Sequence, residues 1–302
     1  MAVNKELWIP AVVEYFFKTN QFANFAVNED EYVVGGSIVH IPNAGAPSGT
    51  ERNRVVLPAA INRREDLDVT YELDEFTSDP ALISNRDKVE LSYDKTASQV
   101  RQDTQALQES AGDWLLYKWL QNIPAANKIL STGANATATA PGATGNRKII
   151  TEADLRKAKV TLDNQKVPKM GRYMLLSSNL MDQLISDEKL RYAFANPISL
   201  EDGTFPRYAG FTLLDRADVG VQATGGTAGV LKAPGAASAT TDDEVAFFWQ
   251  VDSVSRAMGT VDIFQDLGNP VYYGDIYSFL MRLGGRNRRY DNKGVGTIVV
   301  AP

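Results

Sequence analysis

A short stretch of this 302-residue sequence holds seven carboxylates, which are the side chains here most able to do chemistry: Glu65, Asp66, Asp68, Glu72, Asp74, Glu75 and Asp79. Two carboxyl groups on either side of a sugar linkage can hydrolyse it, so a carboxylate-dependent glycan hydrolase is one hypothesis. The alternative is a solvated or partner-facing strand edge, because Asp68, Glu72 and Asp74 alternate with apolar residues. The alternation favours the second interpretation.

Histidine and cysteine, two of the side chains most used in catalysis, are nearly absent. The chain has a single histidine, His40, and no cysteine, which excludes disulfides, thiolate ligands and multi-histidine metal sites and suits a reducing cytosol. His40 lies in a strand-like run without a GxSxG elbow, so we expect a structural residue and not the base of a serine hydrolase. The sequence contains no Gly-Lys pair and therefore no P-loop. We expect no catalytic residue, no cofactor and no metal.

Composition and length narrow the class of protein further. A chain with 44% apolar residues can form one large or two small folded domains. Its net charge of −6 argues against a protein whose surface mainly grips nucleic-acid phosphate. The N-terminus lacks a basic region followed by an apolar run, and no stretch approaches the roughly 18 apolar residues of a membrane span. We expect no membrane partner.

The charges are unevenly distributed. Residues 65–94 hold ten acidic against two basic residues, a net −8, whereas residues 282–293 hold five basic against one acidic, a net +4. Opposite patches suit pairing between copies of one chain, and solvated surface is the alternative. The predicted contacts between subunits are Arg52, Arg54, Arg63, Arg64, Glu72, Asp74, Glu75, Arg286, Arg288 and Arg289.

Hydrophobic periodicity in the first third predicts the elements that must position these charges. Apolar residues at helical spacing predict a helix over residues 9–17, and a strand follows at 37–41. Residues 42–53 have no periodicity and predict a projecting loop. Strict alternation then predicts strands around 69–73 and 89–93, separated by a turn at 78–80.

A long helix dominates the rest of the first half. Apolar residues spaced by threes and fours predict it over residues 96–121, about 39 Å long. Its buried stripe passes through Trp114 or Leu115 and through Lys118 or Trp119. Trp114 is the tryptophan that we expect in the core. The Ala, Gly and Thr-rich residues 131–146 predict a mobile internal linker.

The second half predicts a mixture of helices and strands. Helices are expected from residue 151 and from 178 or 179. Residues 220–243 predict a surface loop. Strands are expected at 172–176, 211–214, 245–249, 277–283 and 295–299.

The order of these parts resembles the major capsid protein of tailed bacteriophages, whose shell fold also occurs in encapsulins and the herpesvirus capsid floor. Residues 7–10 (LWIP) and 35–42 (GGSIVHIP) are similar to the N-terminal arm and the start of the extended loop in that family. The long helix that follows the acidic strands resembles the spine helix of the peripheral domain. Residues 167–178 (VPKMGRYMLLSS) and 203–218 are similar to the axial domain of that family. Residues 273–284 and 294–300 (GVGTIVV) are similar to the returning strands of its peripheral domain.

The resemblance implies an α+β capsid shell fold with five parts: an N-terminal arm at 1–33, an extended loop at 34–80, a peripheral domain with the spine helix at 81–150, an axial domain at 151–260 and returning strands at 261–302. It implies a structural, non-enzymatic protein that self-assembles into an icosahedral head around double-stranded DNA. An encapsulin-like compartment shell is the alternative within the fold.

The partners that the resemblance implies are copies of the chain in pentamers and hexamers, a portal protein, and packaged DNA contacted without sequence specificity. The extended-loop pattern begins near residue 35, which leaves no room for a long N-terminal scaffolding segment. Either a separate scaffolding protein is expected or the chain is already processed, and Met1 favours the first. The expected location is the virion, after assembly in the host cytoplasm.

Overall fold

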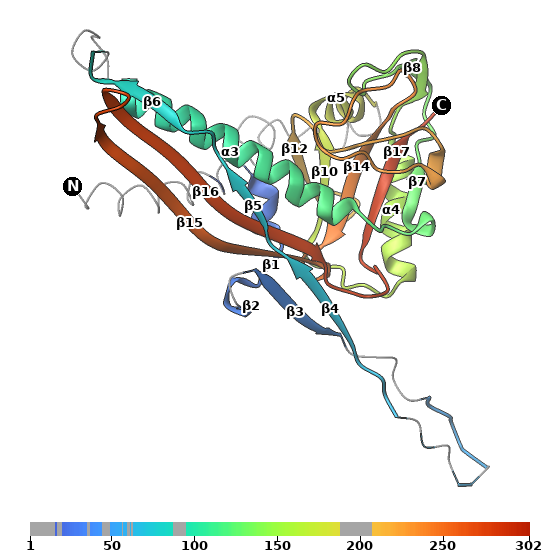
Figure 1. The fold of residues 1–302 in the computed structure, drawn as a ribbon. Coiled ribbons are helices and arrows are strands. Elements are labelled where there is room, and N and C mark those ends of the chain that lie inside the picture. Colours follow the sequence, from blue (N-terminus) through green and yellow to red (C-terminus); the bar gives the residue numbers. More distant parts are fainter. Residues whose placement is uncertain are drawn as a thin grey trace.

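The structure, a computed structural model, describes residues 16, 20–34, 37–43, 49–55, 57–58, 61, 63–86, 95–187 and 207–302. The described helices are α3 (Lys95–Leu120), α4 (Glu152–Asn164) and α5 (Ser178–Ser186), with short 3-10 helices η1 (Gln21–Phe25), η2 (Asp30–Tyr32), η3 (Ala125–Asn127), η4 (Gly226–Ala228) and η5 (Val251–Ser253). A mixed body lies at one end of the molecule, and a long hairpin with α3 extends from it (Figure 1). The predicted helix at 9–17, apart from Phe16, and the predicted strand at 89–93 lie outside the described residues.

The strands fall into two groups along the chain. The first group is β1 (Val27–Asn28), β2 (Val33–Val34), β3 (Ile38–Asn43), β4 (Leu67–Glu72), β5 (Asp74–Thr77), β6 (Ala81–Ser84), β7 (Lys128–Leu130), β8 (Asn135–Thr137) and β9 (Asn146–Lys148). The second is β10 (Arg172–Ser177), β11 (Arg207–Tyr208), β12 (Phe211–Arg216), β13 (Val221–Gln222), β14 (Asp243–Gln250), β15 (Val254–Asn269), β16 (Gly274–Asn287) and β17 (Val295–Val300). The described helices and strands form an α+β fold, the fold class that the sequence predicts.

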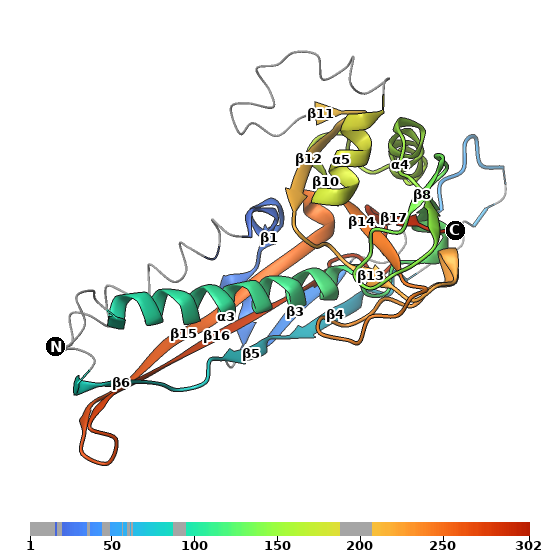
Figure 2. The same cartoon turned by 90° about the horizontal axis from the view of Figure 1, so that it is seen from above.

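The body is built on a mixed sheet that is covered on both faces. Among the described residues this sheet has seven strands, in the order β11-β12-β10-β14-β17-β7, with β13 also paired to β14. Every residue of β14 and β17 is buried. Helices α4 and α5 pack on one face through Leu155 and Leu180, while Phe247 and Trp249 of β14 turn to the other face and meet α3 (Figure 2). Strands with two buried faces read as continuous apolar runs, as here.

The elongated part is a sheet that packs against α3 through one of its faces. β15 and β16 pair along most of their length, and β5, β6 and β1 pair at their edges. Side chains alternate along β16, so that Tyr277, Phe279, Met281 and Leu283 are all buried, as the sequence predicts. The core face of this hairpin, with Phe279 and Met281, belongs to the same hydrophobic cluster as α3.

Helix α3 agrees with the predicted range to within one residue at each end, but the prediction for its tryptophan is wrong. Trp119 is fully buried and donates from Nε1 to the Ser255 carbonyl at 2.8 Å, whereas Trp114 is only half-buried. The apolar stripe therefore passes through Leu115 and Trp119. β16 approaches closely here because Gly285 has no Cβ, which would otherwise lie 2.5 Å from Leu115 Cδ1.

Three other local predictions need correction. Residues 131–146 are not a structureless linker: they contain the β8–β9 hairpin, which bonds to the second small-residue stretch through Thr144 N and the Thr240 carbonyl at 2.9 Å. That second stretch includes β13 and η4. Residues 78–80 do not reverse the chain, since β5 and β6 both pair with β16 in the same direction. Ser78 bridges the break by bonding to Phe279.

The C-terminal strand β17 pairs with β14 and β7, so it returns to the seven-stranded sheet and not to the β15–β16 hairpin. The other predicted strands of the second half and the helix start at residue 151 are confirmed, the latter with Thr151 N donating to Asp154 Oδ2 at 3.0 Å. The second helix starts one residue early, because Ser177 provides its N-cap.

Candidate assembly interface

The β3–β4 hairpin projects from the body (Figure 1). The strands stay in register from Ile38 and Glu72 to Asn43 and Leu67, so residues 42 and 43, predicted as loop, belong to β3. One face of the hairpin is buried through Val39, Ile41, Val69 and Tyr71. The base of the hairpin is therefore packed on the subunit while its far end extends into solvent.

The segment joining β3 to β4 carries apolar side chains that no described part of the subunit covers. Val55 is 88% exposed, Leu57 77% and Ile61 100%. We call residues 49–64, as far as they are described, the extended segment. Large aliphatic side chains presented this far from a core gain about 1.5–3 kcal/mol each when another surface buries them.

Four predicted contact residues lie in this extended segment. Arg54 pairs with Glu51 at 3.1 Å, and Arg64 pairs with Asp66 at 2.6 Å. Arg52 and Arg63 are exposed and have no ion pair within the described residues. The segment thus combines exposed aliphatic and cationic groups.

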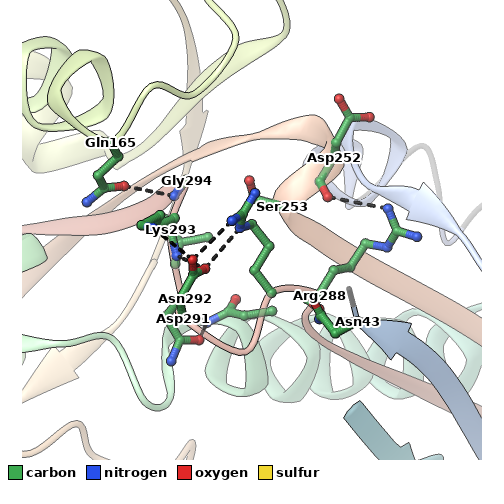
Figure 3. Close-up of polar contacts among 12 residues, drawn as sticks. Asn43, Gln165, Asp252, Ser253, Arg288, Asp291, Asn292, Lys293 and Gly294 are labelled. Carbon is green, nitrogen blue, oxygen red and sulfur yellow. Dashed lines mark hydrogen bonds and ion pairs between the residues drawn. The ribbon is translucent and has the colours of Figure 1, made fainter. Parts of the chain in front are cut away.

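A buried carboxylate fixes the base of the hairpin. Glu29 is 3% exposed, accepts from Tyr71 Oη at 3.0 Å and accepts from Arg288 Nε at 2.9 Å. Asn43 donates from Nδ2 to the Arg288 carbonyl, and Arg288 Nη1 reaches the Asp252 carbonyl at 3.4 Å (Figure 3). Burial first, and then the Glu29 carboxylate, raise the pKa of Tyr71 above its usual range, so its hydroxyl remains a donor. Glu29 thereby joins the N-terminal region, the hairpin and the end of β16.

The remaining predicted cations also have partners in the same chain. Arg286 donates from Nη1 to the Thr70 carbonyl at 2.8 Å. Arg289 makes two bonds to Asp291, of 2.9 and 3.0 Å, in the loop after β16. These bonds from Arg289, together with Lys293, hold the pKa of Asp291 well below its usual range. Arg286 and Arg288 therefore help to organise the hairpin base within one subunit, whereas Arg289 orders the loop after β16.

The predicted acidic residues are distributed along strand edges and do not converge. Asp74 pairs with Lys118 at 3.0 Å, and Glu75 pairs with Arg282 at 2.7 Å. Asp68 pairs with the exposed His40 at 2.8 Å. Glu72 is exposed. Asp74 and Glu75 each face their own cation, which is typical of a charged sheet edge, and this arrangement gives no support to the hydrolase hypothesis.

The described ranges contain no group of three or more His, Asp or Glu side chains arranged to hold a metal ion. In the same ranges no helix is both long and apolar enough to cross a bilayer.

Comparison with known proteins agrees with this geometry. A sequence model of the phage capsid protein family matches residues 27–262, more than half of the chain. The chain belongs to the phage capsid protein family. It is a structural major capsid protein of a bacteriophage and a component of the virion. No curated protein sequence matches the capsid protein.

Solved structures share its fold at low sequence identity. A structure from Mycobacterium phage Che8 is 18% identical with a TM-score of 0.61, covering 92% of this chain and 90% of that one. The capsid of Ralstonia phage GP4 is 12% identical with a TM-score of 0.63, covering 94% and 90%. A virus-like particle from Pyrococcus furiosus is 9% identical with a TM-score of 0.55, covering 98% and 99%. The family match and the phage capsid neighbours do not favour the alternative of an encapsulin-like compartment shell.

Sequence analysis missed two residues of the hairpin base in this capsid protein. Glu29 and Tyr71 lie 42 positions apart, and Arg288 is 259 positions from Glu29. A lone Glu carries no motif, and Tyr71 was predicted only as an apolar strand residue. The sequence signal that pointed to this site was the basic run at residues 282–293, which contains Arg288.

Proposed function

We propose that this capsid protein assembles into an icosahedral head around double-stranded DNA, with the extended segment of each copy lying over a neighbouring copy. The observation that carries the proposal is a hairpin whose base is buried and whose far end exposes Val55, Leu57 and Ile61. Exposed apolar groups of this kind cost nothing to the subunit fold and gain free energy only when a partner covers them.

The proposed shell is made of pentamers and hexamers of the capsid protein. Its other proposed partners are a separate scaffolding protein, a portal protein and packaged DNA contacted without sequence specificity, with assembly in the host cytoplasm. These partners rest on the family resemblance.

We propose that the domains of the chain correspond to its sheets and have different roles. The N-terminal arm (1–33) and extended loop (34–80) connect subunits, α3 with the β15–β16 hairpin forms the peripheral domain, and the seven-stranded sheet forms the axial domain. The boundaries at 81–150, 151–260 and 261–302 are adjusted where the sheets cross them. β7 and β17 are assigned to the axial domain because both belong to the seven-stranded sheet, and the start of β15, at residues 254–260, is assigned to the peripheral domain because it pairs with β16.

Contacts between subunits are proposed first at Arg52, Arg54, Arg63 and Arg64, which lie on the extended segment. Contacts at Glu72, Asp74, Glu75, Arg286, Arg288 and Arg289 stay a prediction. Reversing Arg288 would place a second carboxylate against Glu29, so substitutions there cannot separate assembly from folding.

Electron microscopy of the purified full chain, in negative stain, tests the proposed function. Closed shells of uniform diameter are the expected result. Monodisperse small particles at all protein and salt concentrations would overturn the proposal, and release of reducing sugar from a glycan panel by such particles would favour the hydrolase hypothesis instead.

A further inference from the structure

A basic run that the sequence analysis did not single out lies on α4 and the turn that follows it. Residues 156–172 hold six basic residues and one acidic residue, a net +5, which exceeds the +4 of residues 282–293. Arg156, Lys159 and Asp163 recur at helical spacing and therefore lie on one stripe of α4. The acidic residue of the run is thus placed among its cations.

That carboxylate is held from below and leaves the exposed cations without a partner. Arg172 is buried, pairs with Asp163 at 2.8 Å, and donates to two carbonyls of the turn at 2.8 and 2.9 Å. Lys166 adopts a φ of 59° at the end of the helix, where its N–H donates to the Asp163 carbonyl at 3.0 Å. The turn at 165–171 is therefore ordered, and it presents Lys166 and Lys169 to solvent.

The tertiary structure adds the loop after β16 to this surface. Gly294 N donates to Gln165 Oε1 at 3.0 Å, which joins the loop to the end of α4 (Figure 3). In that loop Arg289 and Lys293 share one carboxylate, that of Asp291, at 2.9 and 3.0 Å. The loop therefore contributes a further excess of positive charge.

Residues 156–172 and 289–293, which we call the basic edge, carry a net +6 in a chain whose net charge is −6. The remaining 280 residues consequently carry −12. A subunit with this distribution attracts a polyanion to the basic edge and repels it from the rest of its surface. The acidic total therefore hides a local site for a polyanion.

Three lysines of the basic edge have no ion pair within the described residues. Arg156 and Lys157 pair with carboxylates in the first turn of α4, at 2.8 and 3.5 Å. Lys159, Lys166 and Lys169 are exposed and make no such pair in the part of the chain that the structure describes. Attraction to the carboxyl end of α4 explains Lys166, but it decays within the last turn and does not explain the other two.

The predominance of lysine distinguishes between two kinds of anionic partner. Interfaces between proteins are depleted of lysine, because its long side chain loses entropy when it is ordered and its ammonium group is strongly hydrated. Contacts to nucleic-acid phosphate use lysine readily, since they position the duplex through charge and need no fixed geometry. The chemistry of the basic edge therefore favours a phosphate backbone over an acidic protein surface.

We propose that the basic edge contacts the phosphate backbone of the packaged double-stranded DNA through Lys159, Lys166 and Lys169. This inference rests on the proposed function and names the surface of each copy that faces the DNA. An acidic surface of a second copy is the other occupant, and the experiments below separate the two.

DNA binding by unassembled subunits gives the first test. Lys159→Gln with Lys166→Gln and Lys169→Gln should lower the affinity for linear double-stranded DNA about tenfold or more at low salt. The slope of log K against log salt concentration should become shallower by about 2 to 3, because each lost phosphate contact removes about 0.9. These substitutions are at exposed positions, so melts of the variant should match those of wild type.

A matched triple variant provides the control. Arg101→Gln with Lys148→Gln and Arg207→Gln changes the net charge by the same amount at exposed positions outside the basic edge. Its DNA affinity should stay within about twofold of wild type. Equal losses of affinity in the two triple variants would mean that the whole surface responds to charge, and this would overturn the proposal.

Shell assembly separates DNA from a second copy as the partner. The variant that lacks the three lysines of the basic edge should form closed shells as wild type does, by negative-stain microscopy. Loss of shells would assign the basic edge to a contact between copies and overturn the proposal. Closed wild-type shells should bind added DNA of several kilobases far more weakly than subunits do, because the basic edge faces inward. Lysine-dependent binding of that DNA to intact shells would place the edge on the outer surface and also overturn the proposal.

This failure and that of the proposed function are distinguishable. Absence of shells from the wild-type chain would overturn the icosahedral head, while lysine-dependent binding of DNA by its subunits would still support the basic edge as a phosphate-binding surface. Closed shells from a chain whose DNA affinity does not depend on the three lysines would keep the head and overturn the DNA contact.

Discussion

The seven-stranded sheet and the β15–β16 hairpin differ in how many of their faces the subunit covers. Helices α4 and α5 cover one face of the seven-stranded sheet, α3 and Trp119 cover the other, and β14 and β17 are buried throughout. Among the described residues the hairpin has α3 on one face only, and its far end exposes Phe264, Tyr272 and Tyr273. The first region gains its stability within the subunit, and the second leaves apolar surface exposed.

The projecting β3–β4 hairpin extends this contrast. Its base is fixed by Glu29, Tyr71 and Arg288, whereas its extended segment exposes apolar and cationic groups. Substitutions in the doubly covered region should therefore change the free energy of unfolding, and changes at the exposed ends should change assembly.

The largest effect on folding is expected at Trp119. Trp119→Ala should lower the free energy of unfolding by about 3–5 kcal/mol, because it removes a fully buried ring and its bond to Ser255. Trp114→Ala should cost about 1 kcal/mol, since Trp114 is half-buried and packs edge-on against Tyr117. Denaturant melts of unassembled subunits measure both. Equal losses of unfolding free energy at the two positions would contradict the assignment of Trp119 to the buried stripe of α3.

A smaller effect is expected at the hairpin base. Glu29→Gln should lower the free energy of unfolding by about 2 kcal/mol, because it replaces the charged acceptor of Tyr71 and Arg288. Limited proteolysis should then cut the β3–β4 hairpin faster while the seven-stranded sheet stays protected. Glu31→Gln, at an exposed position two residues away, is the control and should behave as wild type. An unchanged digestion pattern in the Glu29 variant would mean that this carboxylate does not hold the hairpin.

A pH-dependent effect below about 1 kcal/mol is expected at Asp291, which is partly exposed and therefore screened by solvent. Arg289 and Lys293 lower its pKa in the folded state. A carboxyl with a lowered pKa stabilises the fold above its ordinary pKa of about 4, and this contribution is lost as pH falls toward the folded value. The stability difference between wild type and Asp291→Asn should thus be present at pH 7 and shrink below pH 4 in chemical melts. A difference that is independent of pH would refute the assignment.

Replacing the extended segment should have the smallest effect on folding and should abolish assembly. Asn43 and Leu67 are register partners, so a two-residue Asn-Gly turn can replace residues 44–66 and close the hairpin. The free energy of unfolding should stay within about 0.5 kcal/mol of wild type, because the replaced segment packs against nothing described in the subunit. Microscopy should show no shells. Normal shells, or an unfolded subunit by circular dichroism, would each contradict the role of the segment.

The sequence predicted those elements whose signals are local. Periodicity located α3 to within a residue, alternation identified the buried face of β16, and the carboxylate three residues after Thr151 marked the start of α4. Each signal depends on backbone geometry that repeats over a few residues, so it can be recognised without knowledge of neighbours.

Predictions failed where distant segments compete for the same space. The stripe of α3 allowed Trp114 or Leu115 to face inward, and packing against Ser255 and β14 selected the side with Trp119. The small-residue stretch at 131–146 was predicted as a linker, yet the second stretch, at 220–243, bonds to it through Thr240 and Thr144. Low side-chain volume permits both a loop and a close contact.

The sequence by itself determined the class of this protein: an acidic chain without cysteine, with separated charge patches and an order of parts that resembles a phage capsid protein. The tertiary structure decided which charges remain available for assembly. Arg288 and Glu29 neutralise each other across 259 positions, while Arg52 and Arg63 have no ion pair in the described residues. Pairing depends on distances of a few ångströms between segments, and only the folded chain sets those distances.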